Sequence, residues 1–390
     1  MPIEHLLNMR AIDAMIIRGG SSKGVYLDIA DLPPAGPERD EAVLRIFGSP
    51  DERQIDGLGG ADKLTSKVAV MGPPTRDGCD IDYLFGQVNQ ALPRIDWRPN
   101  CGNLSAGAAL YGALLGKGRL EGDAMRIDVH QVNTGRVLRT TVPMLGDAPA
   151  VEGDFAIGGV PGTAARLDVD FGGFAGSALG GDVLPTGNAR DIYDIPGLGP
   201  IEASVIDMAN LLIFVRAADV GLDTGLSVNE MQADPALVNQ LEAIRKVVSH
   251  ELGFITGPDA DQELMVSLNP LVFAVAAPRD YAATDGTSIR AVDHDLYARS
   301  FGRRAFSKAY PGSGSAGTAV AVGIEGTLAQ EYCRNAPAPG RDYEMRIGHP
   351  GGCLSVRART DLDTQGRMRV SKAEIGRTAR LLMQGKAFFR

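Results

Sequence analysis

The residues best placed to do chemistry surround Cys101, which is flanked by Asn100 on one side and by Gly102 and Asn103 on the other. An apolar segment of small residues, 103–115, follows and predicts a helix packed closely on most of its faces. The first turn of a helix has unpaired N–H groups and a partial positive charge, which bind anions and favour a thiolate. A free cysteine is more often a buried structural residue, but the polar and conformationally permissive neighbours favour a functional role here.

Three short segments recur later in the chain in the same order, which predicts an internal duplication. The match places Cys101 opposite Pro311, so only the first half carries a thiol. We expect two pseudo-symmetric domains, residues 1–186 and 187–390, that face each other across a cleft, a usual place for a small-molecule site. The matching segments are 26–32 with 214–220, 68–73 with 273–278, and 105–110 with 315–320.

Short strands separated by tight turns are expected to dominate both halves, because 49 glycines and 23 prolines interrupt brief apolar runs. Helices are a minority, expected at 103–115, 235–250 and 371–384. The last is predicted from a capping-box pattern, Ser371 to Glu374, and from Gly385 after its end. The pattern indicates an α+β fold.

Seven motifs in order along the chain resemble the diaminopimelate epimerase superfamily, and in detail its cofactor-independent isomerase branch. That branch includes 2-methylaconitate, 3-methylitaconate and 4-oxalomesaconate isomerases, and the "RGGSSKG" start is most similar to the last. The resemblance implies two pseudo-symmetric domains, each with strands wrapped round a central apolar helix. The motifs lie at 15–27, 65–74, 100–110, 132–135, 184–188, 312–321 and 346–352.

Lys67 begins a predicted apolar strand, where a solvated strand end is the ordinary interpretation. The resemblance places a lysine here in the active site beside the cysteine, and the repeat puts apolar Val272 opposite it. A lysine desolvated by its surroundings can work as a general base. The resemblance thus implies a 1,3-allylic proton shift in which Lys67 and Cys101 take and return the proton, in an order that the sequence leaves open. This chemistry needs no redox cofactor and no metal.

Unsaturated di- and tricarboxylic acids are the substrates that the resemblance implies, and they need several groups that bind carboxylates. A glycine-rich turn offers Arg18, Ser21 and Ser22, although such a turn alone is weak evidence. Further cations that could bind carboxylates are Arg98, Arg279, Arg303 and Lys308, most of which we expect to be solvated. The remaining candidate substrate-binding residues are Asn100, Gly102, Asn103, Asn210, Ser313, Gly314, Ser315 and His349.

Composition excludes several other classes of function. A net charge of −9 argues against a nucleic-acid surface, and four scattered cysteines and five scattered histidines show no spacing typical of a metal site. No apolar run reaches the length of a membrane span, and the N-terminus lacks the pattern of a secretory signal. We therefore expect a cytoplasmic protein without membrane or nucleic-acid partners. The number of subunits is open, a homodimer being one option.

Alternatives to an oxalomesaconate isomerase remain at this point. One is the 2-methylaconitate isomerase of propionate metabolism, and another is a non-catalytic accessory protein that binds a carboxylate. An epimerase would need a second proton carrier in the later half. Pro311 cannot carry a proton, and the hydroxyl of Ser313 is a poor substitute, so racemisation by two thiols is disfavoured.

Overall fold

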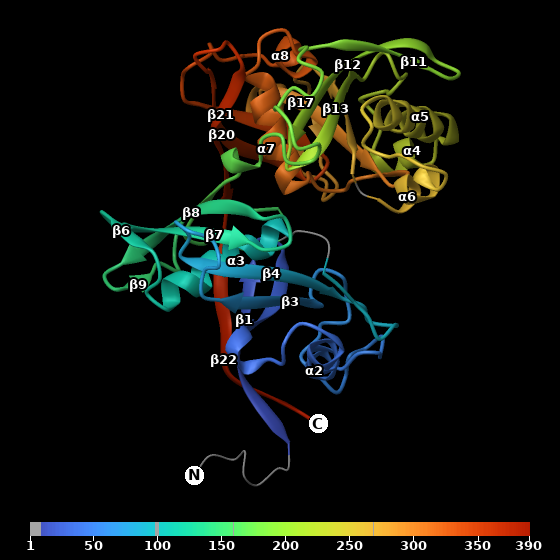
Figure 1. Ribbon diagram of the computed structural model, residues 1–390. Coiled ribbons are helices and arrows are strands. Elements are labelled where there is room, and N and C mark those ends of the chain that lie inside the picture. Colours follow the sequence, from blue (N-terminus) through green and yellow to red (C-terminus); the bar gives the residue numbers. More distant parts are fainter. Residues whose placement is uncertain (1–8, 98–100, 159, 268) are drawn as a thin grey trace. The chain divides into compact units, whose positions relative to one another are not determined.

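The computed structural model describes residues 9–97, 101–158, 160–267 and 269–390 (Figure 1). The chain forms two compact units, one of residues up to Val169 together with Gly376–Arg390, and the other of Asp170–Ile375. The division differs from the expected boundary between 186 and 187, and the last fifteen residues return to the first unit. They return because β22 (Ala379–Phe389) pairs with β1 (Arg10–Gly19) along its whole length. A sequence repeat gives no signal for such a partner.

Unit 1 contains a sheet in the order β22, β1, β2, β3, β4, β7, β8. Its central pairs alternate between antiparallel (β1 with β2, β3 with β4) and parallel (β2 with β3, β4 with β7). The further strands of unit 1 are β2 Ser22–Asp28, β3 Lys67–Gly72, β4 Ile81–Val88, β5 Ile95–Asp96, β6 Arg119–Glu121, β7 Ala124–Gln131, β8 Arg136–Leu145 and β9 Ala148–Pro149.

Two helices pack on the sheet of unit 1. The predicted central helix is confirmed as α3 (Gly102–Leu114), which is apolar on all sides and buried from Leu104 to Ala113. The second, α2 (Pro37–Phe47), was not predicted; it starts with a proline and ends at Gly48 in the left-handed region, as helices commonly do. Its apolar face packs on side chains of β2 and β3.

Unit 2 repeats this sheet in the order β11, β12, β13, β14, β17, β19, β20, β21, with α7 (Gly312–Val322) as its central helix. The predicted helix at 235–250 is confirmed as α5 (Pro235–Glu251), capped by the carboxylate of Asp234. The strands are β11 Asp191–Ile195, β12 Gly199–Met208, β13 Asn210–Arg216, β14 Leu271–Ala276, β15 Tyr281–Ala282, β16 Ser288–Ile289, β17 Leu296–Gly302, β18 Ala305–Phe306, β19 Tyr343–His349, β20 Gly352–Leu362 and β21 Met368–Arg377, with β10 (Leu167–Asp170) at the passage between the units.

Short helical segments complete the two units. The α-helices are α4 Val228–Gln232, α6 Ala260–Val266 and α8 Leu328–Tyr332, and the 3₁₀ turns are Ile29–Asp31, Gly172–Phe174 and Ala291–Asp293. Within the described ranges, no helix combines the length and the apolar character that crossing a bilayer requires.

The predicted duplication is confirmed by the pairing pattern. The antiparallel and parallel pairs from β1 to β8 recur in the same sequence from β12 to β20. Tyr26 pairs with Ala69 in unit 1, whereas the matching Phe214 pairs with Phe273 in unit 2. The counterpart of Lys67 is therefore Leu271, one residue before the expected Val272, and it is equally apolar and buried.

The two central helices contain small residues for the same physical reason, which is close packing against the sheet. A methyl group added at Gly107 would lie 2.1 Å from the hydroxyl oxygen of Tyr26, and one added at Gly317 would lie 2.0 Å from Leu212 Cδ1. Each helix can approach its sheet this closely only with a glycine at the contact. The recurring "SAG" segments therefore mark equivalent contacts in the two units.

The prediction of a helix at 371–384 is wrong, because these residues form most of β21 and β22. Apart from Leu382, the Ala, Ile, Leu and Met residues there lie at odd-numbered positions, 373, 375, 379, 381 and 383, which fits the period of a strand. Ser371 does not cap a helix; its hydroxyl donates to Asp361 Oδ2 at 2.6 Å. Ser371 and Glu374 match the capping-box pattern by chance. The strand conformation is determined by the pairing of β21 with β20 and of β22 with β1.

Candidate active site

The structure brings the two predicted proton carriers into contact. The Nζ of Lys67, the first residue of β3, lies 3.2 Å from the Sγ of Cys101, the N-cap residue of α3. Both side chains are buried, with 8% and 7% of their surfaces exposed. The ring of Phe85 lies 5.2 Å from the same Nζ, within the range of a cation–π contact. An amine and a thiol in contact, with little water around them, can exchange a proton directly.

Hydrogen bonds fix the backbone of Cys101 while the thiol remains in contact with the lysine. The carbonyl of Cys101 accepts from the backbone N–H and the hydroxyl of Ser105, at 3.1 and 3.0 Å, and from the hydroxyl of Tyr83 at 3.5 Å. Burial raises the pKa of Tyr83 and of Tyr26 well above its usual range, and negative charge on Cys101 raises it further. The two phenols thus stay neutral beside the thiol.

The glycine-rich turn between β1 and β2 is held against the first turn of α3. The amide of Asn103 donates to the hydroxyls of Ser21 and Ser22, at 3.2 and 3.4 Å. The turn needs Gly20 because its φ is +53°. The structure thus brings Ser21, Ser22 and Asn103 together near Gly102, the first residue of the helix. Asn100 and Arg98 lie outside the described residues.

Arg18 is not gathered with this group. The neighbouring Gly19 faces α3, since a methyl added there would lie 2.4 Å from the carbonyl oxygen of Asn103, so Arg18 points to the other face of the sheet. There its Nη1 donates to Gly20 O, Thr378 O and Thr378 Oγ1, each at 2.9 Å. The structure gives Arg18 a role in holding the turn and not a position beside Cys101.

Unit 2 contains an equivalent polar contact, in which the asparagine belongs to the strand and the serine to the helix. The amide of Asn210, the first residue of β13, donates to the hydroxyl of Ser313 in the first turn of α7 at 2.5 Å. By the strand register, Asn210 occupies the position of Ser22, and Ser313 that of Asn103. The turn before Asn210 also contains a residue in the left-handed region, Ala209 at φ 59°.

The other candidates in unit 2 are used in local structure. The Ser315 hydroxyl donates to Gly312 O at 2.7 Å, and Gly314 lies so close to Phe273 that an added methyl would be 2.8 Å from its ring. The ring of His349 lies 5.8 Å from that of Tyr310, beside the start of α7, and its Nδ1 accepts from the N–H of Gly351. Of the candidate residues of unit 2, Ser313 and His349 therefore have side chains that contact other residues near the start of α7: Ser313 contacts Asn210, and His349 contacts Tyr310.

Sequence reasoning missed Tyr83 and Phe85, the aromatic residues of β4 on either side of the amine–thiol pair. Both belong to a strand whose composition is ordinary for a buried sheet, so only the pairing of β4 with β3 indicates their role. Among the described residues, no three histidine, cysteine or carboxylate side chains are arranged to hold a metal ion.

The fold and the site define a class of protein: a duplicated α+β scaffold in which one copy alone carries a buried amine–thiol pair at the start of its central helix. A family described as PrpF protein matches residues 9–390, and the chain belongs to this family. The resemblance inferred from the motifs is thereby confirmed.

Three relatives match nearly the whole chain. "3-methylitaconate isomerase" of Eubacterium barkeri is 37% identical over 97% of both chains, and "2-methyl-aconitate isomerase" of Shewanella oneidensis is 34% identical over 96% of both. "(4E)-oxalomesaconate Delta-isomerase" of a Novosphingobium species is 36% identical over 98% of both. The chain is accordingly an isomerase.

Solved structures confirm the expected fold class. A crystal structure of methylitaconate-delta-isomerase has a TM-score of 0.89 and 36% identity, and the match covers 98% of this chain and 96% of that one. A hydroxyproline epimerase from Agrobacterium vitis has a TM-score of 0.50 at 11% identity, over 97% and 93% of the two chains, which shows a common fold alone.

Proposed function

We propose that Lys67 and Cys101 move one proton along an unsaturated polycarboxylic acid in a 1,3-allylic shift. The observation that carries this proposal is the contact of 3.2 Å between the amine and the thiol in a buried position. One group removes a proton from a carbon next to the double bond, the electron pair shifts through the double bond to give a dienolate, and the proton returns two carbons away. No net oxidation occurs, so the step needs acid and base groups and no electron carrier.

The asymmetry between the two units supports isomerisation over racemisation. The counterparts of Cys101 and Lys67 in unit 2 are Pro311 and Leu271, neither of which can take or give a proton. Proton transfer from two opposite faces of one carbon would need a carrier in each unit. A single amine–thiol pair is instead suited to moving a proton between two carbons on one side of a substrate.

We propose 4-oxalomesaconate as the substrate, in the breakdown of aromatic acids such as protocatechuate and gallate. The "RGGSSKG" turn, whose serines meet Asn103, supports this choice. The alternatives are 2-methylaconitate and 3-methylitaconate, since relatives named for all three kinds of acid are 34 to 37% identical to this chain. The first turn of α3, whose N–H groups have no partner within the helix, is where we place a substrate carboxylate.

Deuterium exchange tests the substrate and the reaction together. The protein is incubated with each of the three acids in deuterated buffer, and the products are followed by NMR spectroscopy. We expect deuterium at the proton-accepting carbon and a moved double bond with oxalomesaconate, and much slower reaction with the other two. Faster reaction with another acid would change the substrate, and exchange with none would contradict the proton shift and favour a non-catalytic carboxylate-binding protein.

A further inference from the structure

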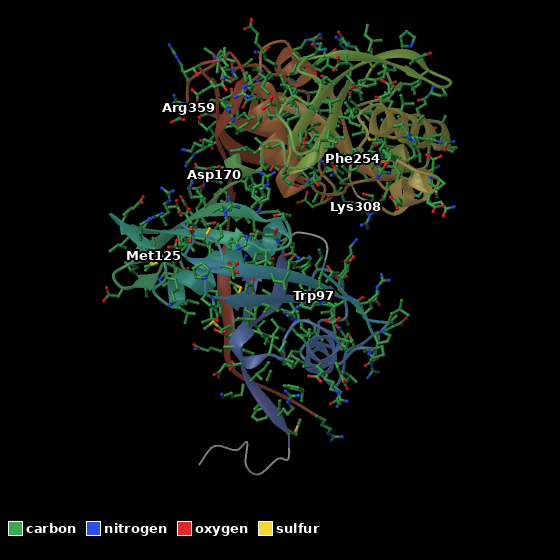
Figure 2. The ribbon with its side chains drawn as sticks, viewed as in Figure 1. Trp97, Met125, Asp170, Phe254, Lys308 and Arg359 are labelled. Atoms are coloured by element: carbon green, nitrogen blue, oxygen red, sulfur yellow. The ribbon has the colours of Figure 1, made fainter. Side chains whose placement is uncertain are left out.

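Unit 2 contains a cavity of about 300 Å³ that the proposed reaction does not use. Two cationic side chains line it, Arg299 from β17 and Lys308 from the segment before α7. Lys308 is exposed at the surface of unit 2, where Figure 2 labels it. The remaining lining residues are mostly apolar or hydroxyl-bearing: Leu226, Ser227, Val228, Asn229, Ala282, Ala283, Thr284 and Pro350.

The side chain of Arg299 lies on the face of the sheet opposite α7. Arg299 pairs directly with Ala274, and Ala274 belongs to the apolar cluster that packs under α5. The next residue, Ser300, pairs with Phe273, whose ring contacts Gly314 of α7. Since directly opposed residues project to one face of a sheet, Arg299 points away from the helix start where Asn210 and Ser313 meet. The Arg299 side chain therefore lies on the other face of the sheet from that polar contact, whereas Lys308 and Pro350 of the lining adjoin Gly351.

Arg299 is a buried cation without a counter-ion in the described part of the chain. Only 4% of its surface is exposed, and no carboxylate of the described residues forms an ion pair with it. Its Nη1 donates to the carbonyls of Ala298 and Gly348, at 3.0 and 3.4 Å, whereas its Nε has no hydrogen-bond partner. Burial lowers the pKa of Arg299, which reflects the cost of an uncompensated charge.

Aromatic rings hold the guanidinium in place. The rings of Tyr297 and Tyr281 lie 3.8 and 4.8 Å from its central carbon. Such stacking fixes the plane of the group and offsets part of the burial cost, but it supplies no negative charge. The Nη1 side is occupied by carbonyls and Nε is sealed from solvent, so Nη2 is the donor that a ligand in the cavity would reach. A carboxylate accepts strongly from a charged N–H donor of this kind.

We propose that this cavity binds a small dicarboxylate. One carboxylate accepts from Nη2 of Arg299, and the second faces the ammonium of Lys308. The apolar lining suits a short hydrocarbon chain between two charges. The residues of this site all belong to unit 2, whereas the amine–thiol pair belongs to unit 1.

Equilibrium dialysis with radiolabelled succinate tests this site. In full-length protein we expect Lys67→Met to retain binding, Arg299→Lys to weaken it at least tenfold, and Lys308→Gln to weaken it several-fold. Arg299→Lys keeps the charge but loses the Nη2 donor and the planar group, and Lys308→Gln changes an exposed side chain. Arg303→Gln, an exposed cation nearby in the chain that does not line the cavity, is the matched control and should bind as the unchanged protein does.

Three results would overturn the proposal. Binding that is abolished by Lys67→Met and unchanged by Arg299→Lys would place all the succinate at the amine–thiol pair, whatever the reaction there is. Binding unaffected by Lys308→Gln and by Arg299→Lys would exclude the cavity even if one variant folded poorly, which thermal unfolding of each variant reports. Tighter binding of inorganic phosphate, with the same dependence on Arg299, would replace the carboxylate by a phosphate group.

Discussion

The amine of Lys67 lies 3.2 Å from the thiol of Cys101, and two different elements hold the pair together. Lys67 is the first residue of β3, and Cys101 precedes α3, whose close contact with β1 depends on Gly19 and Gly107. The distance is therefore a property of the helix-on-sheet packing of unit 1. Changes to either side chain should affect reaction without affecting the fold.

Replacing either proton carrier should nearly abolish isomerisation. We expect Lys67→Met and Cys101→Ser each to lower kcat/KM by about 10²- to 10⁴-fold, the usual contribution of a positioned acid or base. Steady-state kinetics with the substrate found by deuterium exchange measures this. Cys353→Ser, in unit 2, where the thiol donates to the carbonyl of Asp293, is the control and should leave kcat/KM unchanged.

The same variants tell which group takes the proton. If Lys67 is the base, Cys101→Ser should still exchange substrate hydrogen with deuterated solvent while isomerisation fails, because only return of the proton is lost. The opposite pattern would assign removal to the thiol. Full activity in both variants would contradict the proposed mechanism.

Phe85 should act as a positioning residue for the amine. Its ring lies 5.2 Å from Lys67 Nζ, an interaction worth about 0.5–2 kcal/mol, so Phe85→Leu should lower kcat by roughly 2- to 30-fold with little change in KM. Phe85→Tyr keeps the aromatic face and should restore most of the rate. Equal losses in both variants, or a loss confined to KM, would show that the ring acts through packing or substrate binding instead.

The part of the site that could be predicted lies where local sequence determines local structure. Cys101 and Asn103 occur at a helix start that is recognisable from the small apolar residues after it. The duplication identified Pro311, which has no thiol, as the counterpart of Cys101. The face on which Arg18 lies could not be predicted, because a register shift of one residue reverses every side chain of a strand. Residues 371–384 fitted both a helical cap and a period of two, and only pairing with distant strands decided between them.

The asparagine–serine contact has opposite polarity in the two units, so exchanging the two residues in unit 2 should restore stability that either single substitution loses. Asn210→Ser and Ser313→Asn should each lower the free energy of unfolding by about 1 kcal/mol, since each breaks the 2.5 Å hydrogen bond. The double variant reproduces the arrangement of unit 1, where a helix asparagine donates to a serine of the turn, and should recover a good part of that loss. Urea unfolding of the four proteins gives the coupling directly; strictly additive losses would mean that the contact is not equivalent in the two units.

The burial of the His294 imidazole predicts that unit 2 loses stability in acid. The ring is fully buried; as a neutral tautomer its Nδ1 donates to Arg290 O at 3.1 Å and its Nε2 accepts from the N–H of Arg279 at 3.4 Å. Burial lowers the pKa of His294 below its ordinary 6.5, so the unfolded chain binds a proton at a pH where the folded chain does not. The stabilisation is thus fully present above pH 6.5 and is lost as the pH falls below that value toward the folded pKa.

Urea unfolding at a series of pH values between about 5 and 8 measures this loss. His294→Gln should be less stable at the alkaline end and should show a flatter dependence below pH 6.5, because the titrating group is gone. If His294→Gln and the unchanged protein lose stability in parallel as the pH falls, the acid sensitivity of unit 2 comes from other groups, and the buried imidazole is not its source.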